Sequence, residues 1–119
     1  MLIRAFPRCG GAHHHSEAYA RGASPEGVQL LHTWPDANLR ELHDLVKQLE
    51  PAARDRGSRC SFAIVYPDQR GVLSVKEVGV VRTGVHGADD EKTLSELHFQ
   101  AGDFLDVAIS NAHTNSPHK

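Results

Sequence analysis

Cysteine and long apolar runs are both scarce in this sequence. Only two cysteines occur among 119 residues, Cys9 and Cys60, and no metal-like spacing relates them. Isolated thiols of this kind fit a reducing compartment, cytosol or nucleus. No run of about eighteen apolar residues is present, so the sequence predicts no transmembrane helix. Arg4 and Pro7 interrupt the first apolar stretch, and we therefore expect no signal peptide.

An excess of positive charge is also missing. The sequence carries 13 Lys and Arg against 15 Asp and Glu, a formal net charge of -2. A module that binds nucleic acid through phosphates is usually basic, so this balance argues against autonomous DNA or RNA binding. Membership of a complex that itself holds nucleic acid is still open. With 119 residues and 39% hydrophobic content, the chain has the size of one domain with one modest core.

One amphipathic helix, over residues 36–50, organises the rest of the pattern. Asp36 is suited to the N-cap because its carboxylate accepts hydrogen bonds from the first turn, and Pro51 ends the helix by restricting the residue before it. His43 is expected at the boundary of the apolar face. Apolar residues recur at three- and four-residue spacing and predict one buried face, formed by Leu39, Leu42, Leu45, Val46 and Leu49.

Five apolar runs with strand character lie on both sides of this helix. They are residues 2–6, 28–34, 60–66, 72–81 and 104–109. Pro7 ends the first run, and Gly79 predicts a bulge in the fourth. From alternation we expect Val28 and Leu30 to face inward, and Asp106 in the last run to face outward.

The order of these elements is strand, strand, helix, strand, strand, strand. A right-handed crossover and short connections leave few arrangements other than the β-grasp of ubiquitin. The predicted fold class is therefore α+β: a ubiquitin-like β-grasp with a mixed sheet of about five strands, one main helix packed across it and long inserted loops. We expect one domain over residues 1–110. Residues 111–119 lack apolar periodicity and are predicted to form a disordered C-terminal tail.

Three consecutive histidines, His13, His14 and His15, suggest a metal site at first sight. Consecutive side chains in an extended loop point in different directions, so only two of them would usually share one ion. No acidic or cysteine ligand lies at a recognised spacing from them. The favoured interpretation is a solvated or partner-contacting loop, with a small metal-binding protein as an alternative.

The remaining candidates for chemistry favour structural roles. Cys60 lies in an apolar strand, where cysteine usually behaves as an inert small hydrophobic residue, whereas a reactive thiolate needs an exposed, positive setting. Of Asp103 and Asp106, we expect one to cap a turn and the other to face solvent. The sequence therefore predicts neither an enzyme nor a bound cofactor.

Many positions between residues 2 and 110 resemble one family in both order and spacing. They are His13, His14, Tyr19, Arg21, Gly22, Thr33, Trp34, Asp36, Ala37, 39–42, 45–47, Pro51, Ala53, Arg54, 62–65, 75–77, Gly79, Gly84, Gly87, Asp89, Asp90, Thr93, Leu94, 99–103, Leu105, Asp106, Ala108 and Ile109. The chain thus resembles the family of the Sin-three-associated polypeptide of eighteen kilodaltons. It departs from that family's pattern at His15, at Cys60, where an aromatic is usual, and in a shorter turn at 67–71.

The resemblance implies a ubiquitin-like fold and a non-enzymatic nuclear subunit. Its implied partners are Acinus or pinin and the RNA-binding protein with a serine-rich domain. Together these form the apoptosis- and splicing-associated complex, which is linked to the exon junction complex. The resemblance also implies association with the Sin-three histone deacetylase corepressor, and so a role in transcription repression. Nucleic acid would be contacted only indirectly and membrane not at all. The main alternative is a direct RNA-binding module.

Partner docking is expected at the two long loops, residues 7–27 and 82–96. Neither is needed to complete a ubiquitin-like core, and loops on a rigid scaffold commonly carry binding. The alternative for the first loop is that Tyr19 merely pins it to the core. An acidic loop is usually solvated, but its carboxylates can also pair with a partner's arginines. The expected partner-binding residues are His13, His14, Tyr19, Arg21, Asp89, Asp90 and Glu91.

Overall fold

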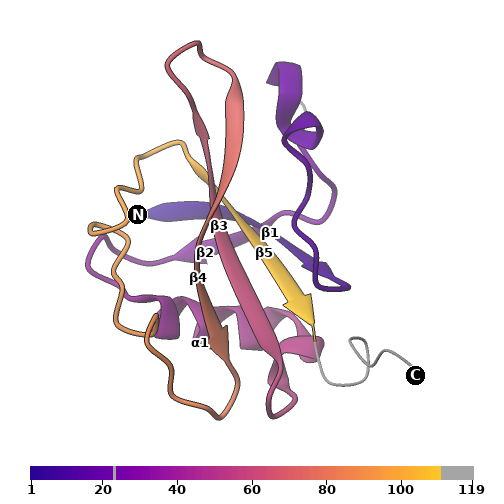
Figure 1. Cartoon of the computed structure of the whole chain (residues 1–119), viewed down its shortest axis with the longest axis vertical. Helices are drawn as coiled ribbons and strands as arrows, with labels where there is room; N and C mark the ends of the chain where they lie inside the picture. The colour runs from indigo at the N-terminus through magenta and orange to yellow at the C-terminus, as the bar shows by residue number, and fades with distance from the viewer. Residues whose placement is uncertain (23, 111–119) are drawn as a thin grey trace.

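The computed structural model describes residues 1–22 and 24–110 (Figure 1). Within them the chain forms five β-strands, one α-helix and two short 3-10 helices. In chain order these are β1 (Leu2–Cys9), η1 (Ser16–Gly22), β2 (Gln29–His32), α1 (Leu39–Leu49), η2 (Pro51–Arg54), β3 (Arg59–Pro67), β4 (Leu73–Arg82) and β5 (Phe104–Ser110). The expected tail, 111–119, lies outside the described residues.

The strands form one mixed sheet in the order β2-β1-β5-β3-β4. β1 and β5 run parallel near its centre, and the other neighbours are antiparallel. Helix α1 lies across one face of the sheet, as Figure 1 shows. This arrangement confirms the predicted α+β, ubiquitin-like β-grasp fold. The prediction that Pro7 ends the first strand is wrong, because β1 continues beside β5 to Cys9. Pairing with β2 stops at Ala5, and the free edge beyond it tolerates a residue without an N–H.

The N-cap of helix α1 lies two residues later than the sequence predicted. It is Asn38, not Asp36, because Asn38 and Glu41 form a reciprocal capping box. The Asn38 side chain accepts from Glu41 N at 2.9 Å, and Glu41 Oε1 accepts from Asn38 N at 3.1 Å. The helix ends before Pro51, as expected. No helix in the described part of the chain is long and apolar enough to cross a membrane.

The inner face of α1 agrees with most of the apolar stripe. Leu39, Leu42 and Val46 are buried and Leu45 packs against them, whereas Leu49 is 41% exposed and was wrongly placed in the core. His43, expected at the boundary, is fully buried. The apolar stripe therefore predicted correctly which side of α1 faces the sheet, but not how far the buried face extends along the helix.

The core between α1 and the sheet is completed by alternate residues of the strands. In β2 the inward residue is Leu31, which pairs with buried Ile3 of β1. The prediction that Val28 and Leu30 face inward is therefore wrong, and Leu30 is 52% exposed. Each side of this run carries a leucine, so alternation alone did not fix which side faces the core, and a one-residue shift reverses every side chain.

The predicted bulge in β4 is present opposite β3. Phe62 pairs with Gly79 and the next residue, Ala63, pairs with Glu77, so Val78 is the extra residue. A Cβ on Gly79 would stand 2.5 Å from Leu39 Cδ1, which explains why glycine occupies this point of contact with α1.

Candidate functional site

A loop covers much of the sheet face that lies opposite α1. This histidine loop, residues 10–22, leaves β1 where Gly10 and Gly11 adopt positive φ angles, and both of their N–H groups donate to Ile109 O. It then forms η1, whose Tyr19 is fully buried. The Tyr19 ring packs edge-on against Phe6 at 5.5 Å and stacks on Phe104 at 5.7 Å. These contacts confirm that Tyr19 pins the loop to the core, the alternative that the sequence left open.

The polar centre under the histidine loop is Asp106 of β5. It was expected to face solvent, and that prediction is wrong because the loop covers the outer face and leaves Asp106 0% exposed. The Tyr19 hydroxyl donates to Asp106 Oδ2 at 2.5 Å. His13 Nδ1 lies 2.7 Å from Oδ1 and His14 Nδ1 lies 2.7 Å from Oδ2. One carboxylate thus ties three side chains of the loop to the sheet.

The electrostatics of this cluster favour an ionised carboxylate. Burial disfavours ionisation of Asp106, but the hydrogen bonds from His13, Tyr19 and His14 outweigh it and lower the pKa of this carboxyl below its usual value. Burial, and next the hydrogen bond to Asp106 and its charge, raise the pKa of Tyr19 above its usual range. Tyr19 therefore remains a hydrogen-bond donor, and the buried charge is fully partnered.

His13 also connects Asp106 of β5 with side chains of the neighbouring strands β3 and β4. Its Nε2 lies 2.8 Å from Ser61 Oγ, and the Ser61 hydroxyl donates to Glu77 Oε2 at 2.5 Å. The two ring nitrogens of His13 therefore join the Asp106 carboxylate to the Ser61 hydroxyl. The chain from Asp106 to Glu77 is thus a polar bridge across three strands.

The arrangement of these groups suits a structural role, in which they hold the histidine loop in place. Nδ1 of both histidines is directed at one carboxylate, and the described residues contain no group of three His, Cys, Asp or Glu side chains suited to hold a metal ion. Cys60 is buried in β3, and burial first, then the nearby Cys9, raise its pKa to about 12. At neutral pH it is a thiol inside the core, as its apolar strand predicted.

Within the acidic segment 89–91, Asp90 is held inside the fold. Asp90 is only 1% exposed and forms an ion pair with Arg40, with Nη2 and Oδ2 2.8 Å apart. Arg40 also donates to the carbonyl oxygens of Arg82 and Val85. Burial opposes ionisation of Asp90, but its bonds from Arg40 and Gly87 N dominate and lower its pKa. The interpretation of this segment as a solvated loop is therefore wrong for Asp90.

Its two acidic neighbours differ in their exposure. Asp89 accepts from Val80 N at 2.9 Å and pairs with Lys92 at 2.8 Å, while Glu91 is exposed. A charge reversal at Asp90 would break an internal ion pair, so it cannot report on partner binding alone. Glu91 is the member of the segment that is free to meet a partner's cation.

The predicted partner-binding residues form two separate groups. His13, His14 and Tyr19 meet at Asp106, and Asp89, Asp90 and Glu91 follow β4 and its turn. The side chain of Arg21 lies outside the described part of the structure. Sequence reasoning missed Asp106 as the centre of the first group. The available signal was a single carboxylate within a strand that is otherwise mostly apolar.

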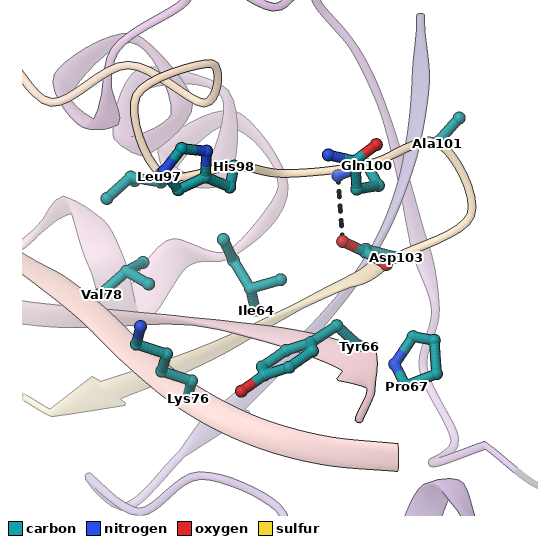
Figure 2. Close-up of a pocket in the computed structure, with 10 residues that line it drawn as sticks. All are labelled: Ile64, Tyr66, Pro67, Lys76, Val78, Leu97, His98, Gln100, Ala101 and Asp103. Carbon is teal, nitrogen blue, oxygen red and sulfur yellow. Dashed lines mark hydrogen bonds between the residues drawn. The ribbon is translucent and has the colours of Figure 1, made fainter. Parts of the chain in front are cut away.

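Among the hollows on the described surface, two have a largely apolar lining that includes strand residues. The outer groove, about 690 Å³ in volume, lies beside the histidine loop. Its apolar lining comes mainly from Phe6, Val28, Leu30, Leu73 and Phe104. The β4 pocket, about 410 Å³, lies on the opposite face, between strands β3 and β4 and the segment 97–103. Its lining is Ile64, Tyr66, Pro67, Lys76, Val78, Leu97, His98, Gln100, Ala101 and Asp103, shown in Figure 2.

Asp103 caps the turn that closes the β4 pocket. The sequence predicted this role for either Asp103 or Asp106. Gln100 N donates to Asp103 Oδ2 at 2.9 Å, the dashed line in Figure 2, and Asp103 N donates to Gln100 O at 3.0 Å. His98 holds a positive φ of 61°, a conformation that side-chain-bearing residues seldom adopt. The wall of the pocket is therefore a fixed turn.

A five-stranded mixed sheet with α1 packed across one face defines a ubiquitin-like domain. Comparison with known sequences identifies its family. The family described as Sin3 associated polypeptide p18 (SAP18) matches residues 1–109, and the chain belongs to this family.

Relatives from plants and animals share most of the chain. A protein from Arabidopsis thaliana named histone deacetylase complex subunit SAP18 is 52% identical over 112 residues, which cover 92% of this chain and 73% of the plant protein. The Homo sapiens protein of that name is 42% identical over 111 residues, 92% of this chain and 72% of its own length. The Drosophila melanogaster protein is 42% identical over 112 residues, with 92% and 73% covered.

Proposed function

We propose that this chain is a non-enzymatic interaction subunit of a nuclear histone deacetylase corepressor complex of the Sin3 type. Its similarity to proteins named histone deacetylase complex subunit, over 92% of its length, supports the assignment. The observation that carries it from the structure is the outer groove, where Leu30 is 52% exposed and Val28 is also exposed beside Phe104. Exposed apolar surface around a groove marks a site of protein contact.

The proposal extends to a second assembly. We place the chain with Acinus or pinin and the RNA-binding protein with a serine-rich domain, in the apoptosis- and splicing-associated complex linked to the exon junction complex. The formal net charge of -2 supports a role in which the partners, and not this domain, contact RNA. Localisation in the nucleus follows from both assemblies.

Within these assemblies, we divide the proposed contact residues into exposed residues that touch a partner and buried residues that hold the loops in place. His13 and His14 are partly exposed at the rim of the histidine loop, and Glu91 is exposed beside β4. These residues, with Arg21, are the proposed direct contacts. Tyr19 and Asp90 are buried and would act by fixing the loops that present them.

Affinity purification from nuclear extract tests the proposal. Tagged wild-type protein is expected to recover Sin3 corepressor subunits and Acinus or pinin with the serine-rich-domain protein, before and after nuclease treatment. Leu30→Asp, which places a charge in the outer groove, should reduce recovery of at least one assembly. Leu49→Asp is the matched control, because Leu49 is a 41% exposed leucine on α1, outside the groove and outside both long loops. Absence of both assemblies from the wild-type sample would refute the proposal.

A second variant tests the acidic segment without disturbing the Arg40 ion pair. Glu91→Lys should weaken binding to an arginine-rich partner, and the loss should shrink as salt increases. The thermal midpoint of the free domain should stay unchanged because Glu91 is exposed. An unchanged affinity at low salt would remove this segment from the interface.

A further inference from the structure

The β4 pocket combines an apolar floor with polar groups whose side chains have no partner in the described part of the chain. Ile64, Val78 and Leu97 line the floor. Figure 2 shows Lys76 and Tyr66 on the strand side of the pocket and Leu97 and His98 on the opposite side. Among the described residues, the Lys76 ammonium, the Tyr66 hydroxyl and the His98 ring make no side-chain hydrogen bond or ion pair. An apolar hollow with a few convergent polar groups is the usual form of a recognition site.

The positive charge and hydrogen-bond donors of this pocket favour a negatively charged group on the ligand. Lys76 brings a positive charge, and Tyr66 and His98 can each donate a hydrogen bond. Asp103, the acidic residue of the lining, is buried and its carboxylate already accepts from Gln100 N. A carboxylate on the ligand is therefore the complementary group.

An extended backbone fits the surface that adjoins the pocket. β4 is the last strand of the sheet, and β3 is its sole strand neighbour in the described structure. Beyond the bulge, the side chains of Asp89 and Lys92 already bond to Val80 N and Val78 O. Among residues 1–22 and 24–110, no side chain makes such a bond to the backbone of residues 73–77, which include Lys76. This stretch of edge can accept another strand, which would place alternate side chains over the pocket.

The conformation of His98 shapes the wall of the pocket. His98 has a positive φ, and the turn around it is closed by Phe99 N, which donates to Leu94 O at 3.0 Å. The chain therefore turns at the wall of the pocket, between Leu97 and the capped turn that ends at Asp103.

We propose that the β4 pocket and the adjoining edge of β4 bind an extended peptide segment of a partner protein. The segment adds along residues 73–77, inserts an apolar side chain between Val78 and Leu97, and directs an Asp or Glu carboxylate to Lys76. The inference deepens the proposed function, since it supplies a second contact surface on the face opposite the outer groove.

Selection from a phage-displayed library of short random peptides against the full chain tests this inference. Enriched peptides should carry a large apolar residue with an acidic residue within two positions. A synthetic copy should shift the amide resonances of Ile64, Lys76, Val78 and Leu97, and N-methylation of alternate backbone amides should abolish binding. Enrichment of basic peptides, shifts confined to the outer groove, or no enrichment would each overturn the inference.

Two matched pairs of variants keep the test independent of folding. Ala101→Phe places a bulky side chain on the exposed turn that lines the pocket and should weaken peptide binding, whereas Ala88→Phe, at another exposed turn residue, should not. Lys76→Glu should weaken binding about tenfold or more, in keeping with loss of a charge-assisted contact, while Lys47→Glu on α1 should leave it unchanged. If these peptides fail but nuclear partners are still recovered by affinity purification, the pocket inference falls and the proposed function stands. Equal binding by Ala101→Phe and wild type would likewise overturn the inference.

Discussion

The neutral, buried His43 should make the domain sensitive to mild acid. Its Nε2 lies 2.9 Å from Thr83 Oγ1, and the Thr83 hydroxyl donates to Ala53 O at 2.6 Å. The hydroxyl proton is therefore committed, so His43 Nε2 is the donor and carries the ring proton. Nδ1 is buried without a partner. Protonation would place a second N–H and a charge where nothing accepts them.

The size of this effect follows from the pKa. Burial first, and then the charges of Arg40 and Lys47, lower the pKa of His43 from 6.5 to about 4, against the smaller opposing effects of Asp44 and Asp90. Between these two values the unfolded chain binds a proton that the folded chain does not, so stability falls as pH decreases. At about pH 5 the loss relative to about pH 8 should be about 2 kcal/mol, approaching about 3 kcal/mol at lower pH.

A comparison with His43→Gln isolates the contribution of this residue. Glutamine can keep a donor toward Thr83 but cannot titrate, and carboxylates that titrate in both proteins cancel in the difference. Urea unfolding at about pH 8 and about pH 5 should therefore show about 2 kcal/mol more acid loss in wild type than in the variant. The ring resonances of His43 should also titrate well below the histidine average. Equal acid losses, or a His43 resonance that titrates near pH 6.5, would refute the assigned tautomer and its burial.

The remaining predictions concern packing and the histidine loop, and urea unfolding measures all three. Leu42→Ala should cost on the order of 2–5 kcal/mol, whereas Leu49→Ala, at a 41% exposed position, should cost much less; equal losses would mean that the buried face of α1 is misassigned. Asp106→Asn should cost about 1–3 kcal/mol and increase hydrogen exchange in the histidine loop, and unchanged protection there would contradict its role as the centre of the cluster. Gly79→Ala should cost on the order of 1–3 kcal/mol because its Cβ would overlap Leu39 Cδ1, and a neutral result would show that α1 can move away.

Local signals in the sequence were enough for the architecture. The apolar stripe of α1 and the order of the five runs predicted the β-grasp, because each signal depends on residues close together in the chain. The start of α1 was misplaced since Asp36 and Asn38 both suit an N-cap, and only the reciprocal bond with Glu41 decides between them. Leu30 was misassigned because its register depends on β1, a separate segment of the chain.

The candidate site was less predictable because it depends on what covers each surface. Alternation in β5 correctly put Asp106 on the face opposite α1. It carried no information that the histidine loop folds back over that face and makes it a second, smaller core around Tyr19. Likewise, Asp90 looked like part of a solvated acidic run because its partner, Arg40, lies on α1, some distance away in sequence. Long-range partners decide burial, and local patterns do not contain them.

The position of β5 has a consequence for synthesis of the chain. β1–β2 and β3–β4 are each antiparallel pairs of consecutive strands, and β5 is the strand that joins them into one sheet. Among the described strands it is also the last to be made, and contacts between strands far apart in sequence form slowly. A nascent chain that has not yet released Ser110 from the ribosome therefore holds two separate hairpins with open edges. During that interval, β1 and β3 each present an unpaired edge that any neighbouring strand could occupy.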